Sequence, residues 1–411
     1  MAQLVTELEP ELPYLDTVGL ERHDAIEAVK AARARHWLAR TDMGYSVTRL
    51  QDVTSILRDK RFHSALSFVQ RQPDLADSDW ARNRRQSILT MEGDNHARLR
   101  RLVAPAFTPA SANRLRPTMQ AVVGDLVDRV AGKGECELVA DVCEPYPIPI
   151  ICELLGAPPQ DWKLFSGWAT DIFRIFNNNL AEDLPLIERA STELNAYVTD
   201  MIAERRTDPR DDLLSDLIAI EEEGDRLSTE EMTMLATAVL MAGTDTTRNQ
   251  LACSVALFCE HPDQWALLAE QPELAPRAVE ESMRYLGAVR GTARIASEDI
   301  VYRDVLFPAG TLVSTSLAGA NRDPEAFDDP DVFDITRERG TAQMTFGAGI
   351  HFCMGAALAR AELQEALPLL ARRMPGLTRS GDIEWKPSNF GIWGPARLPL
   401  RFEPSVATVS A

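Results

Sequence analysis

The stretch that decides the fold of this chain is Phe346-Gly347-Ala348-Gly349-Ile350-His351-Phe352-Cys353-Met354-Gly355. Its two glycines, two residues apart, allow backbone bends that a β-carbon would obstruct. Apolar residues recur at helical spacing after Cys353, so the cysteine is predicted to lie at or just before a helix N-terminus. The helix dipole and the free N–H groups there favour a thiolate over a thiol. The stretch therefore predicts a thiolate in a glycine-rich loop, which suits an axial metal ligand or a nucleophile.

Two other interpretations of this stretch can be weighed from the residues. A dinucleotide-binding fingerprint needs Gly-x-Gly-x-x-Gly, and Phe352 stands where the third glycine would be. A Cys/His nucleophile pair is conceivable, but His351 is only two residues from Cys353 and no Gly-x-Cys elbow accompanies it. The residues alone exclude the dinucleotide fingerprint and leave a metal ligand and a nucleophile open.

The remaining cysteines show no grouping of their own. No Cys-x-x-Cys pair occurs, so neither a structural zinc site nor a disulfide framework is expected. We expect small buried hydrophobic side chains at these five positions, namely Cys136, Cys143, Cys152, Cys253 and Cys259.

The pattern Phe-Gly-x-Gly-x-His-x-Cys-x-Gly resembles the haem-binding signature of the cytochrome P-450 family, the haem-thiolate monooxygenases. The resemblance implies that Cys353 is the proximal ligand to the iron of haem b and that His351 contacts a haem propionate. A thiolate ligand donates electron density to the iron and favours O–O cleavage.

A long helix is predicted to begin near Ser228. Ser228 and Glu231 form the Ser-x-x-Glu capping box, apolar residues follow, and Pro262 ends the pattern. Midway lies Ala242-Gly243-Thr244-Asp245-Thr246-Thr247, a polar group flanked by apolar residues. It resembles the family's acid–alcohol motif, which implies that Asp245 and Thr246 deliver protons during oxygen activation.

A second helical motif, Glu281-x-x-Arg284, places both side chains on one helix face. An ordinary surface ion pair is the alternative. The motif resembles the family's structural Glu-x-x-Arg pair, which often takes a second arginine from a Pro-x-Arg-Phe segment. In this chain Val332 stands at that position, and Arg337 is the nearest substitute.

Three further residues resemble the family's haem-propionate ligands: His96 and Arg100, one helical turn apart, and Arg294 on a predicted strand. The run around His96 is also typical of a solvated helix face. Arginine suits a carboxylate because its planar fork can donate two parallel hydrogen bonds.

The fold class expected is mostly α with small peripheral β-sheets, the cytochrome P-450 fold, as a single large domain (residues 1–411) around a buried haem. Residues 1–20 are expected to be loosely ordered. Besides the long helix we expect helices at 113–130, 184–206 and 274–286, and strands at 45–48, 300–302, 311–315 and 398–402, with a turn at 305–310.

By family topology the substrate pocket draws on residues 62–69, 173–176 and 390–393, and on seven individual residues: Ala238, Met241, Ala242, Val289, Arg290, Thr292 and Ile392. Most are apolar or small, which suits a hydrophobic substrate. Arg290 either anchors a substrate carboxylate or takes part in a surface ion pair.

The net charge of the chain limits the classes of binding partner that are expected. With 43 Lys+Arg against 62 Asp+Glu and a net charge of −19, the chain is not expected to bind nucleic acid or anionic membranes. The N-terminus resembles no secretory signal and no long apolar run occurs, so a cytoplasmic location is expected. We also expect a monomer. A locally basic face for docking an electron donor is expected at Arg98, Arg101, Arg114, Arg116, Arg339 and Arg360.

The resemblance implies a monooxygenase that inserts one atom of O₂ into a hydrophobic small molecule of the steroid, terpenoid, fatty-acid-like or secondary-metabolite class. Electrons would come from NAD(P)H through a separate ferredoxin-type or flavodoxin-type protein. The alternatives are a peroxide-driven haem-thiolate hydroxylase and a non-catalytic haem-binding or ligand-binding protein.

Overall fold

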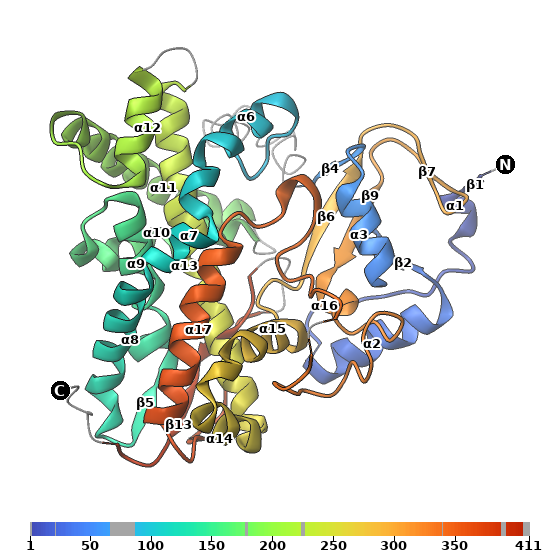
Figure 1. Cartoon of the computed structure of the whole chain (residues 1–411). Coiled ribbons are helices and arrows are strands. Elements are labelled where there is room, and N and C mark those ends of the chain that lie inside the picture. Colours follow the sequence, from blue (N-terminus) through green and yellow to red (C-terminus); the bar gives the residue numbers. More distant parts are fainter. Residues whose placement is uncertain are drawn as a thin grey trace.

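A computed structural model describes residues 2–20, 22–65, 87–176, 180–222, 227–338, 340–387 and 392–405. Helices gather on one side of the molecule, and the largest β-sheet lies on the other (Figure 1). The described residues form two main hydrophobic cores, a large one among the helices and a smaller one around the sheet. The expected fold class, mostly α with small sheets in one domain, is confirmed.

The longest helix is α13 (Thr229–Glu260), whose 32 residues span about 48 Å. Its capping box forms as predicted: the Ser228 hydroxyl accepts from the Glu231 N–H at 3.1 Å, and the Glu231 carboxylate accepts from the Ser228 N–H at 3.0 Å. The helices that pack against α13 include α9 (Pro147–Leu155), α10 (Trp162–Ile172), α11 (Leu180–Thr207) and α17 (Ala356–Arg373). This explains why its middle turns are buried although they carry polar residues.

Two of the other expected helices occur as α11 and α15 (Ala275–Tyr285). The helix expected at 113–130 is two helices, α7 (Pro109–Arg114) and α8 (Arg116–Ala131), which meet at Leu115. Pro117 explains the break, because proline lacks an N–H and is tolerated only in the first turn of a helix.

The five-stranded sheet has the order β2-β3-β9-β6-β4. Its strands are β2 (Leu38–Thr41), β3 (Gly44–Val47), β9 (Leu312–Ser316), β6 (Gly291–Ala296) and β4 (Phe62–Ser64). The β3–β9 pair is parallel, and the other pairs are antiparallel. Strand β6 lies between β9 and β4 in the sheet and follows α15 along the chain.

The turn expected at 305–310 is wrong. β8 (Val305–Phe307) is a strand that pairs antiparallel with β7 (Ile300–Tyr302). The chain reverses one step earlier, at Arg303 and Asp304, whose φ angles are 47° and 61°. Pro308 and Gly310 do form a turn, but this turn follows the end of strand β8.

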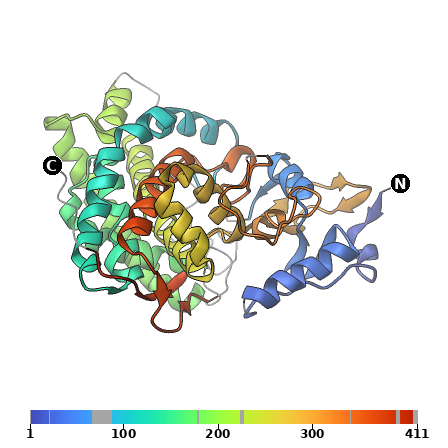
Figure 2. The same cartoon turned by 60° about the horizontal axis from the view of Figure 1, so that its bottom comes forward.

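The N-terminal segment also differs from expectation. β1 (Gln3–Leu4) pairs parallel with β8, and α1 (Val5–Leu8) buries Val5 and Leu8 in the smaller core. Side chains of this segment, among them those of Val5, Leu8, Leu12 and Leu15, are therefore buried, whereas most of residues 16–20 are exposed. The turned view in Figure 2 shows this segment beside α2 (Arg22–Arg35), at the end of the molecule opposite the C-terminus.

The remaining elements complete the two parts. The helices are α3 (Leu50–Arg58), α6 (Gly93–Val103), α12 (Leu213–Glu222), α14 (Pro262–Glu270) and α16 (Leu317–Ala320). The short strands are β5 (Glu135–Glu137), β10 (Thr378–Arg379), β11 (Glu384–Trp385), β12 (Pro395–Arg397) and β13 (Pro399–Arg401). Within the described ranges, no helix combines the length and the apolar character that crossing a membrane requires.

Candidate active site

The cysteine loop precedes α17, as the sequence predicts. Gly347 and Gly349 have φ angles of 70° and 73°, a region that favours glycine. A β-carbon on Gly349 would lie 2.0 Å from the carbonyl oxygen of Leu57, so the loop can approach α3 only through a glycine. The Cys353 N–H donates to the Phe346 carbonyl at 3.0 Å, which closes the loop three residues before the helix begins.

The expected preference of Cys353 for the thiolate is outweighed by burial. Burial raises the pKa of the Cys353 thiol, while the Gly355 N–H and the charges of Arg100 and Arg360 act in the opposite direction. A thiolate at this position therefore needs a further cation bonded to the sulfur.

A cavity of about 1130 Å³ opens on the cysteine loop. Its wall includes Cys353, Arg100, Arg294 and His351, which come from the loop, α6 and β6. His96 does not line the cavity among the described residues, but its ring lies 4.8 Å from that of His351. The structure thus brings together the five residues expected to bind a cofactor.

This end of the cavity holds more positive than negative groups. Burial lowers the pKa of Arg294 to about 10 and also lowers that of Arg100. Burial, followed by the charges of His351 and Arg100, lowers the pKa of His96 to about 4. The buried Nε2 atoms of His96 and His351 have no hydrogen-bond partner among the described residues. Such a site favours a ligand that carries negative charge and accepts hydrogen bonds.

Glu92, which the sequence analysis did not identify, supplies one carboxylate here. Its Oε1 atom accepts from the Ser64 N–H at 2.6 Å and lies 3.7 Å from Nε2 of His351. Burial acts to raise the pKa of Glu92, but the contact with His351 and the hydrogen bond from the Ser64 N–H outweigh it, so the pKa is lowered. Its position one turn before His96 is the sequence signal that could have indicated it.

Thr246 and Asp245 occupy different environments. Thr246 lines the cavity, and its hydroxyl donates to the Ala242 carbonyl at 2.8 Å. Asp245 is 3% exposed and, among the described residues, does not line the cavity. Its carboxylate pairs with Arg248 and lies 3.6 Å from Nζ of Lys386. The Asp245 carboxylate is therefore held in an ion pair beside Thr246, and the cations of Arg248 and Lys386 compensate its charge.

A second acid, also missed, does line the cavity. Glu362 of α17 is buried, and its Oε2 atom accepts from the Thr247 hydroxyl at 3.0 Å. Burial raises the pKa of Glu362 to about 8, and the hydrogen bond from Thr247 opposes this only in part. Its position four residues after Leu358, on the apolar stripe of α17, is the signal that could have revealed a buried carboxyl group.

The comparisons with known proteins can now be stated. The family model described as Cytochrome P450 matches residues 162–374. Nocardicin C N-oxygenase of Nocardia uniformis subsp. tsuyamanensis is 36% identical over 94% of this chain and 97% of its own length. The chain is a member of the cytochrome P450 family. Mycinamicin IV hydroxylase/epoxidase of Micromonospora griseorubida is 38% identical to this cytochrome P450 over 86% of this chain and 88% of its own.

A solved structure agrees with the family assignment of this cytochrome P450. P450BioI in complex with hexadec-9Z-enoic acid ligated Acyl Carrier Protein superimposes with a TM-score of 0.85 at 32% identity. The similarity covers 93% of this chain and 99% of that one. Curated relatives that match most of this chain are named as monooxygenases and hydroxylases. The chain is therefore an oxidoreductase of this family.

The residues present fit the haem that the family implies. Haem carries two propionate carboxylates, which suit the positive, hydrogen-bond-donating wall formed by Arg100, Arg294 and His351. Its iron is the cation that a buried Cys353 thiolate needs.

Of the seven individual residues expected to line the pocket, six lie around this cavity and one does not. Its wall includes Ala238, Met241, Ala242, Val289, Thr292 and Ile392. Ser64, Phe173 and Ile175 from the expected stretches also contribute. From the same stretches, Phe62, His63, Ala65, Arg174 and Trp393 are not among its described lining residues. Residues 66–69, 390 and 391 lie outside the described residues.

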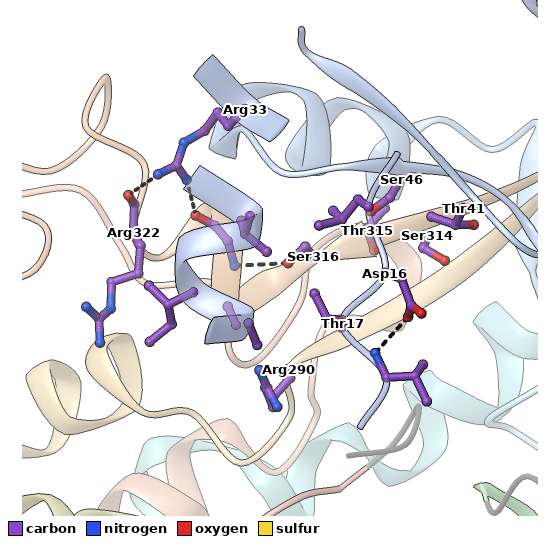
Figure 3. A pocket seen from close by; sticks show the side chains of 18 of the residues that line it. Asp16, Thr17, Arg33, Thr41, Ser46, Arg290, Ser314, Thr315, Ser316 and Arg322 are labelled. Atoms are coloured by element: carbon purple, nitrogen blue, oxygen red, sulfur yellow. Dashed lines mark hydrogen bonds between the residues drawn. The ribbon is translucent and has the colours of Figure 1, made fainter. Parts of the chain in front are cut away.

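Arg290 is the exception. It lies among the residues that line a separate cavity of about 180 Å³, between α2 and the five-stranded sheet (Figure 3). Its guanidinium lies 4.9 Å from the centre of the Trp393 ring. Val289 pairs with Ile392 at the larger cavity, and the next residue turns to the other side, so Arg290 is not part of the described wall.

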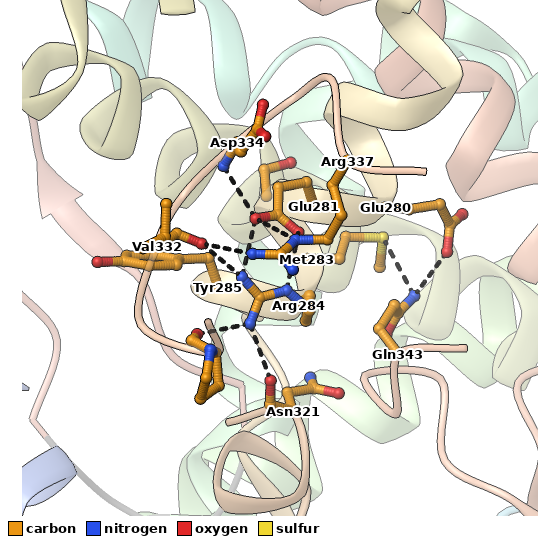
Figure 4. A network of polar contacts seen from close by, with 12 residues as sticks. Glu280, Glu281, Met283, Arg284, Tyr285, Asn321, Val332, Asp334, Arg337 and Gln343 are labelled. Atoms are coloured by element: carbon orange, nitrogen blue, oxygen red, sulfur yellow. Dashed lines mark hydrogen bonds and ion pairs between the residues drawn. The ribbon is translucent and has the colours of Figure 1, made fainter. Parts of the chain in front are cut away.

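Glu281 and Arg284 form the centre of a buried network (Figure 4). The Arg284 guanidinium donates to the Glu281 carboxylate at 2.7 and 2.8 Å and to three backbone carbonyls, those of Asn321, Pro330 and Val332. This ties α15 to the loop that leads to the cysteine stretch. Neither residue lines the large cavity in the described part of the chain.

Proposed function

We propose that this cytochrome P450 is a haem b monooxygenase in which Cys353 binds the iron and a hydrophobic small molecule is oxidised with O₂. The observation that carries the proposal is that one cavity is lined both by Cys353 and by Thr246. When bound, the haem supplies the oxygen-activating chemistry through its thiolate-ligated iron.

The chain's own residues have distinct tasks in this proposal. Arg100, Arg294 and His351 bind the propionates and so orient the cofactor. Thr246 holds a hydroxyl proton at the cavity surface, one residue from the ion-paired Asp245. Release of Asp245 from Arg248 would make a second proton-carrying group available beside it.

The substrate class is supported by the wall and by the relatives. The wall that contains Thr246 includes apolar residues, among them Ile151, Val239 and Met241. Relatives are named for oxidations of nocardicin C, luteothin and mycinamicin IV. A secondary metabolite with an apolar reacting part is therefore the substrate we propose.

We also propose that electrons arrive from a separate ferredoxin-type or flavodoxin-type protein. Three of the arginines expected to dock the electron donor form ion pairs within the chain: Arg98 with Glu231, Arg116 with Glu365 and Arg360 with Glu280. Arg339 lies outside the described residues. Arg101 and Arg114 are the exposed members that remain for a partner to contact.

The test is the optical spectrum of the reduced CO complex. Cys353→Ser should abolish the red-shifted band, whereas Cys136→Ser, which changes a half-buried cysteine outside the cavity wall, should keep it. Turnover with a reconstituted ferredoxin and its reductase then establishes the monooxygenase. A red-shifted band in Cys353→Ser would refute the ligand assignment, and turnover with peroxide alone would favour the peroxide-driven alternative.

A further inference from the structure

Lys386 contacts the acid next to Thr246 from outside the long helix. Its Nζ atom lies 3.6 Å from Oδ1 of Asp245, although the two residues are far apart in the sequence. Arg248, one turn after Asp245 on α13, pairs with the same carboxylate oxygen. Among the described residues, the charge of Asp245 is thus compensated by one cation of its own helix and one cation from the C-terminal part of the chain.

The main chain at Lys386 is held in place by several contacts. Lys386 directly follows β11, which pairs antiparallel with β12. Its N–H donates to the Gly394 carbonyl at 3.0 Å, and its carbonyl accepts from the Trp393 indole N–H at 2.9 Å. The rings of Trp385 and Trp393 stack with their centres 4.4 Å apart. The Lys386 side chain therefore extends from a fixed backbone position.

Gly394 brings this segment close to α13. A β-carbon on Gly394 would lie 2.8 Å from the side-chain oxygen of Asn249 and 3.2 Å from its carbonyl oxygen. Asn249 lies one turn after Asp245, and its side-chain amide donates to the Asp245 carbonyl at 2.6 Å. The segment thus packs on α13 one turn from the acid, which explains how the Lys386 side chain reaches it.

The three charged side chains of this group differ in their access to solvent. The side chain of Asp245 is 4% exposed, that of Arg248 10% and that of Lys386 28%. In the described part of the chain, Asp245 does not line the large cavity either. A buried acid that gives away a proton in each reaction cycle must receive another one from a partner that reaches water. Of its two charged partners, Lys386 is the one that reaches solvent.

The two cations also differ in their chemistry. Arginine keeps its proton in proteins, whereas a lysine ammonium can lose one when its pKa is lowered. Burial lowers the pKa of Lys386, the charge of Asp245 opposes this change and the charge of Arg248 adds to it. The Cys253 thiol also acts on Lys386, but it stays protonated because burial raises its pKa to about 12. Lys386 is therefore the partner of Asp245 that can pass on a proton.

Arg248 keeps a carboxylate partner when Asp245 takes up a proton. Its Nη1 atom lies 3.7 Å from the carboxylate of Glu144. Transfer of a proton from Lys386 to Asp245 turns a buried ion pair into a neutral amine and a neutral acid, and burial favours uncharged groups. The protonation state of Asp245 can thus change without leaving the Arg248 charge uncompensated.

Resting on the proposed function, we propose that Lys386 resupplies Asp245 with protons from solvent. The Lys386 ammonium gives a proton to the Asp245 carboxylate, and the resulting amine binds a proton from solvent. Asp245 then holds its proton beside Thr246 until the reduction of oxygen consumes it. Lys386 does not line the large cavity among the described residues, so it is a positioning residue that acts through Asp245.

The first experiment measures the contact between Lys386 and Asp245 without turnover. NMR of protein labelled at the lysine ε-carbons follows every lysine with pH, because the chain has five of them: Lys30, Lys60, Lys133, Lys163 and Lys386. The signal of Lys386 is the one that Lys386→Arg removes. We expect Lys386 to titrate below the other four lysines, and Asp245→Asn to lower its pKa by about one further pH unit.

The second experiment separates proton supply from charge compensation. Lys386→Arg keeps the positive charge but cannot pass on a proton, whereas Lys386→Gln loses both properties. Oxygen consumption by the haem-loaded protein is measured with a ferredoxin, its reductase and NAD(P)H, without added substrate, in H₂O and in D₂O. Both products of this reaction, hydrogen peroxide and water, need protons. We expect both variants to consume oxygen several-fold more slowly and with a larger solvent isotope effect, because proton supply becomes limiting.

Lys133→Gln is the matched control. Lys133 is exposed and, among the described residues, does not line the large cavity. This variant loses one lysine charge at a position remote from Asp245 in the sequence, and it should keep the natural rate and the natural isotope effect. The CO spectrum of each variant shows that the haem is bound alike.

Two results would overturn the inference. One is oxygen consumption by Lys386→Arg at the natural rate with the natural isotope effect, since the charge alone would then suffice. The other is a Lys386 pKa that does not respond to Asp245→Asn. The proposed function fails separately: a natural protein without the red-shifted CO band refutes it, whereas either of the two results in a protein with the band refutes only the inference.

Discussion

The Nε atom of Arg337 lies 3.4 Å from the carboxylate of Glu281, although 56 positions separate the two residues. The same guanidinium donates to the carbonyls of Asp328 and Asp329. It also donates to the carbonyl of Val332, as Figure 4 shows. Arg337 thereby takes the place of the arginine absent at position 332. Val332 itself contributes its carbonyl, and its side chain is exposed.

We expect Arg337→Ala to destabilise the protein by about 1–3 kcal/mol, because the Asp328 carbonyl loses its donor and the carbonyls of Asp329 and Val332 each lose one of two. Glu281 keeps Arg284. Denaturant unfolding of the haem-loaded protein measures the loss. Arg397→Ala, at an exposed position on β12, is the control and should change stability by less than about 0.5 kcal/mol. Equal stability of the two variants would show that Arg337 is not part of the network.

How much the sequence could predict depends on the range of the interactions. The capping box and the 3.6-residue period of α13 are local, and that helix was predicted to within a residue or two. Arg337 was indicated only as the nearest substitute, because its partner lies on another helix. Strand β8 was missed because three residues carry too little alternation to separate a strand from a turn.

The site shows the same division. Cys353 and His351 share one short motif, so their proximity follows from the chain itself. Glu92 and Glu362 were missed because their importance comes from burial against distant segments, which one sequence does not display. Arg290 was misplaced because adjacent residues in extended chain point to opposite sides, and the pattern did not settle which side faces the cavity.

Gly349→Ala should destabilise the cysteine loop much more than Gly347→Ala. Both glycines have nearly the same positive φ, so each variant bears a backbone strain of about 1–2 kcal/mol. At Gly347 an added β-carbon meets nothing within 4 Å, whereas at Gly349 it lies 2.0 Å from the Leu57 carbonyl oxygen. We expect an additional loss of at least about 2 kcal/mol and weaker haem retention for Gly349→Ala. Similar unfolding midpoints for the two variants would contradict the close approach to α3.

Glu362 should make stability depend on pH in a defined direction. Burial raises its pKa from an ordinary value near 4.5 to about 8 in the folded protein. The unfolded chain then loses the proton first, so the contribution of Glu362 is fully present below about pH 4.5 and is lost as the pH rises to about 8. Each tenfold change in proton affinity is worth about 1.4 kcal/mol.

Glu362→Gln removes the titrating proton and should therefore become more stable relative to the natural protein as the pH rises through this window. Unfolding of both proteins at a series of pH values measures the difference. Glu384→Gln, at an exposed position on β11, should show no such trend. A difference between Glu362→Gln and the natural protein that is constant from pH 5 to about 8 would mean that the carboxyl is already ionised when folded.

Thr246→Ala should separate electron use from product formation. Its hydroxyl is at the cavity surface, and its loss leaves the neighbouring Asp245 engaged with Arg248 and Lys386. Proton delivery then falls to less well-positioned groups, so we expect product per NAD(P)H consumed to fall several-fold while NAD(P)H oxidation continues.

Thr244→Ala is the matched control for this experiment. The Thr244 hydroxyl donates to the Leu240 carbonyl and, among the described residues, Thr244 does not line the cavity. Both variants lose one hydroxyl that bonds to a carbonyl a turn earlier on α13, so helix stability changes alike. Only the loss at Thr246 should lower the coupling. If Thr244→Ala lowered it equally, the effect would come from the helix rather than from a proton held at the cavity surface.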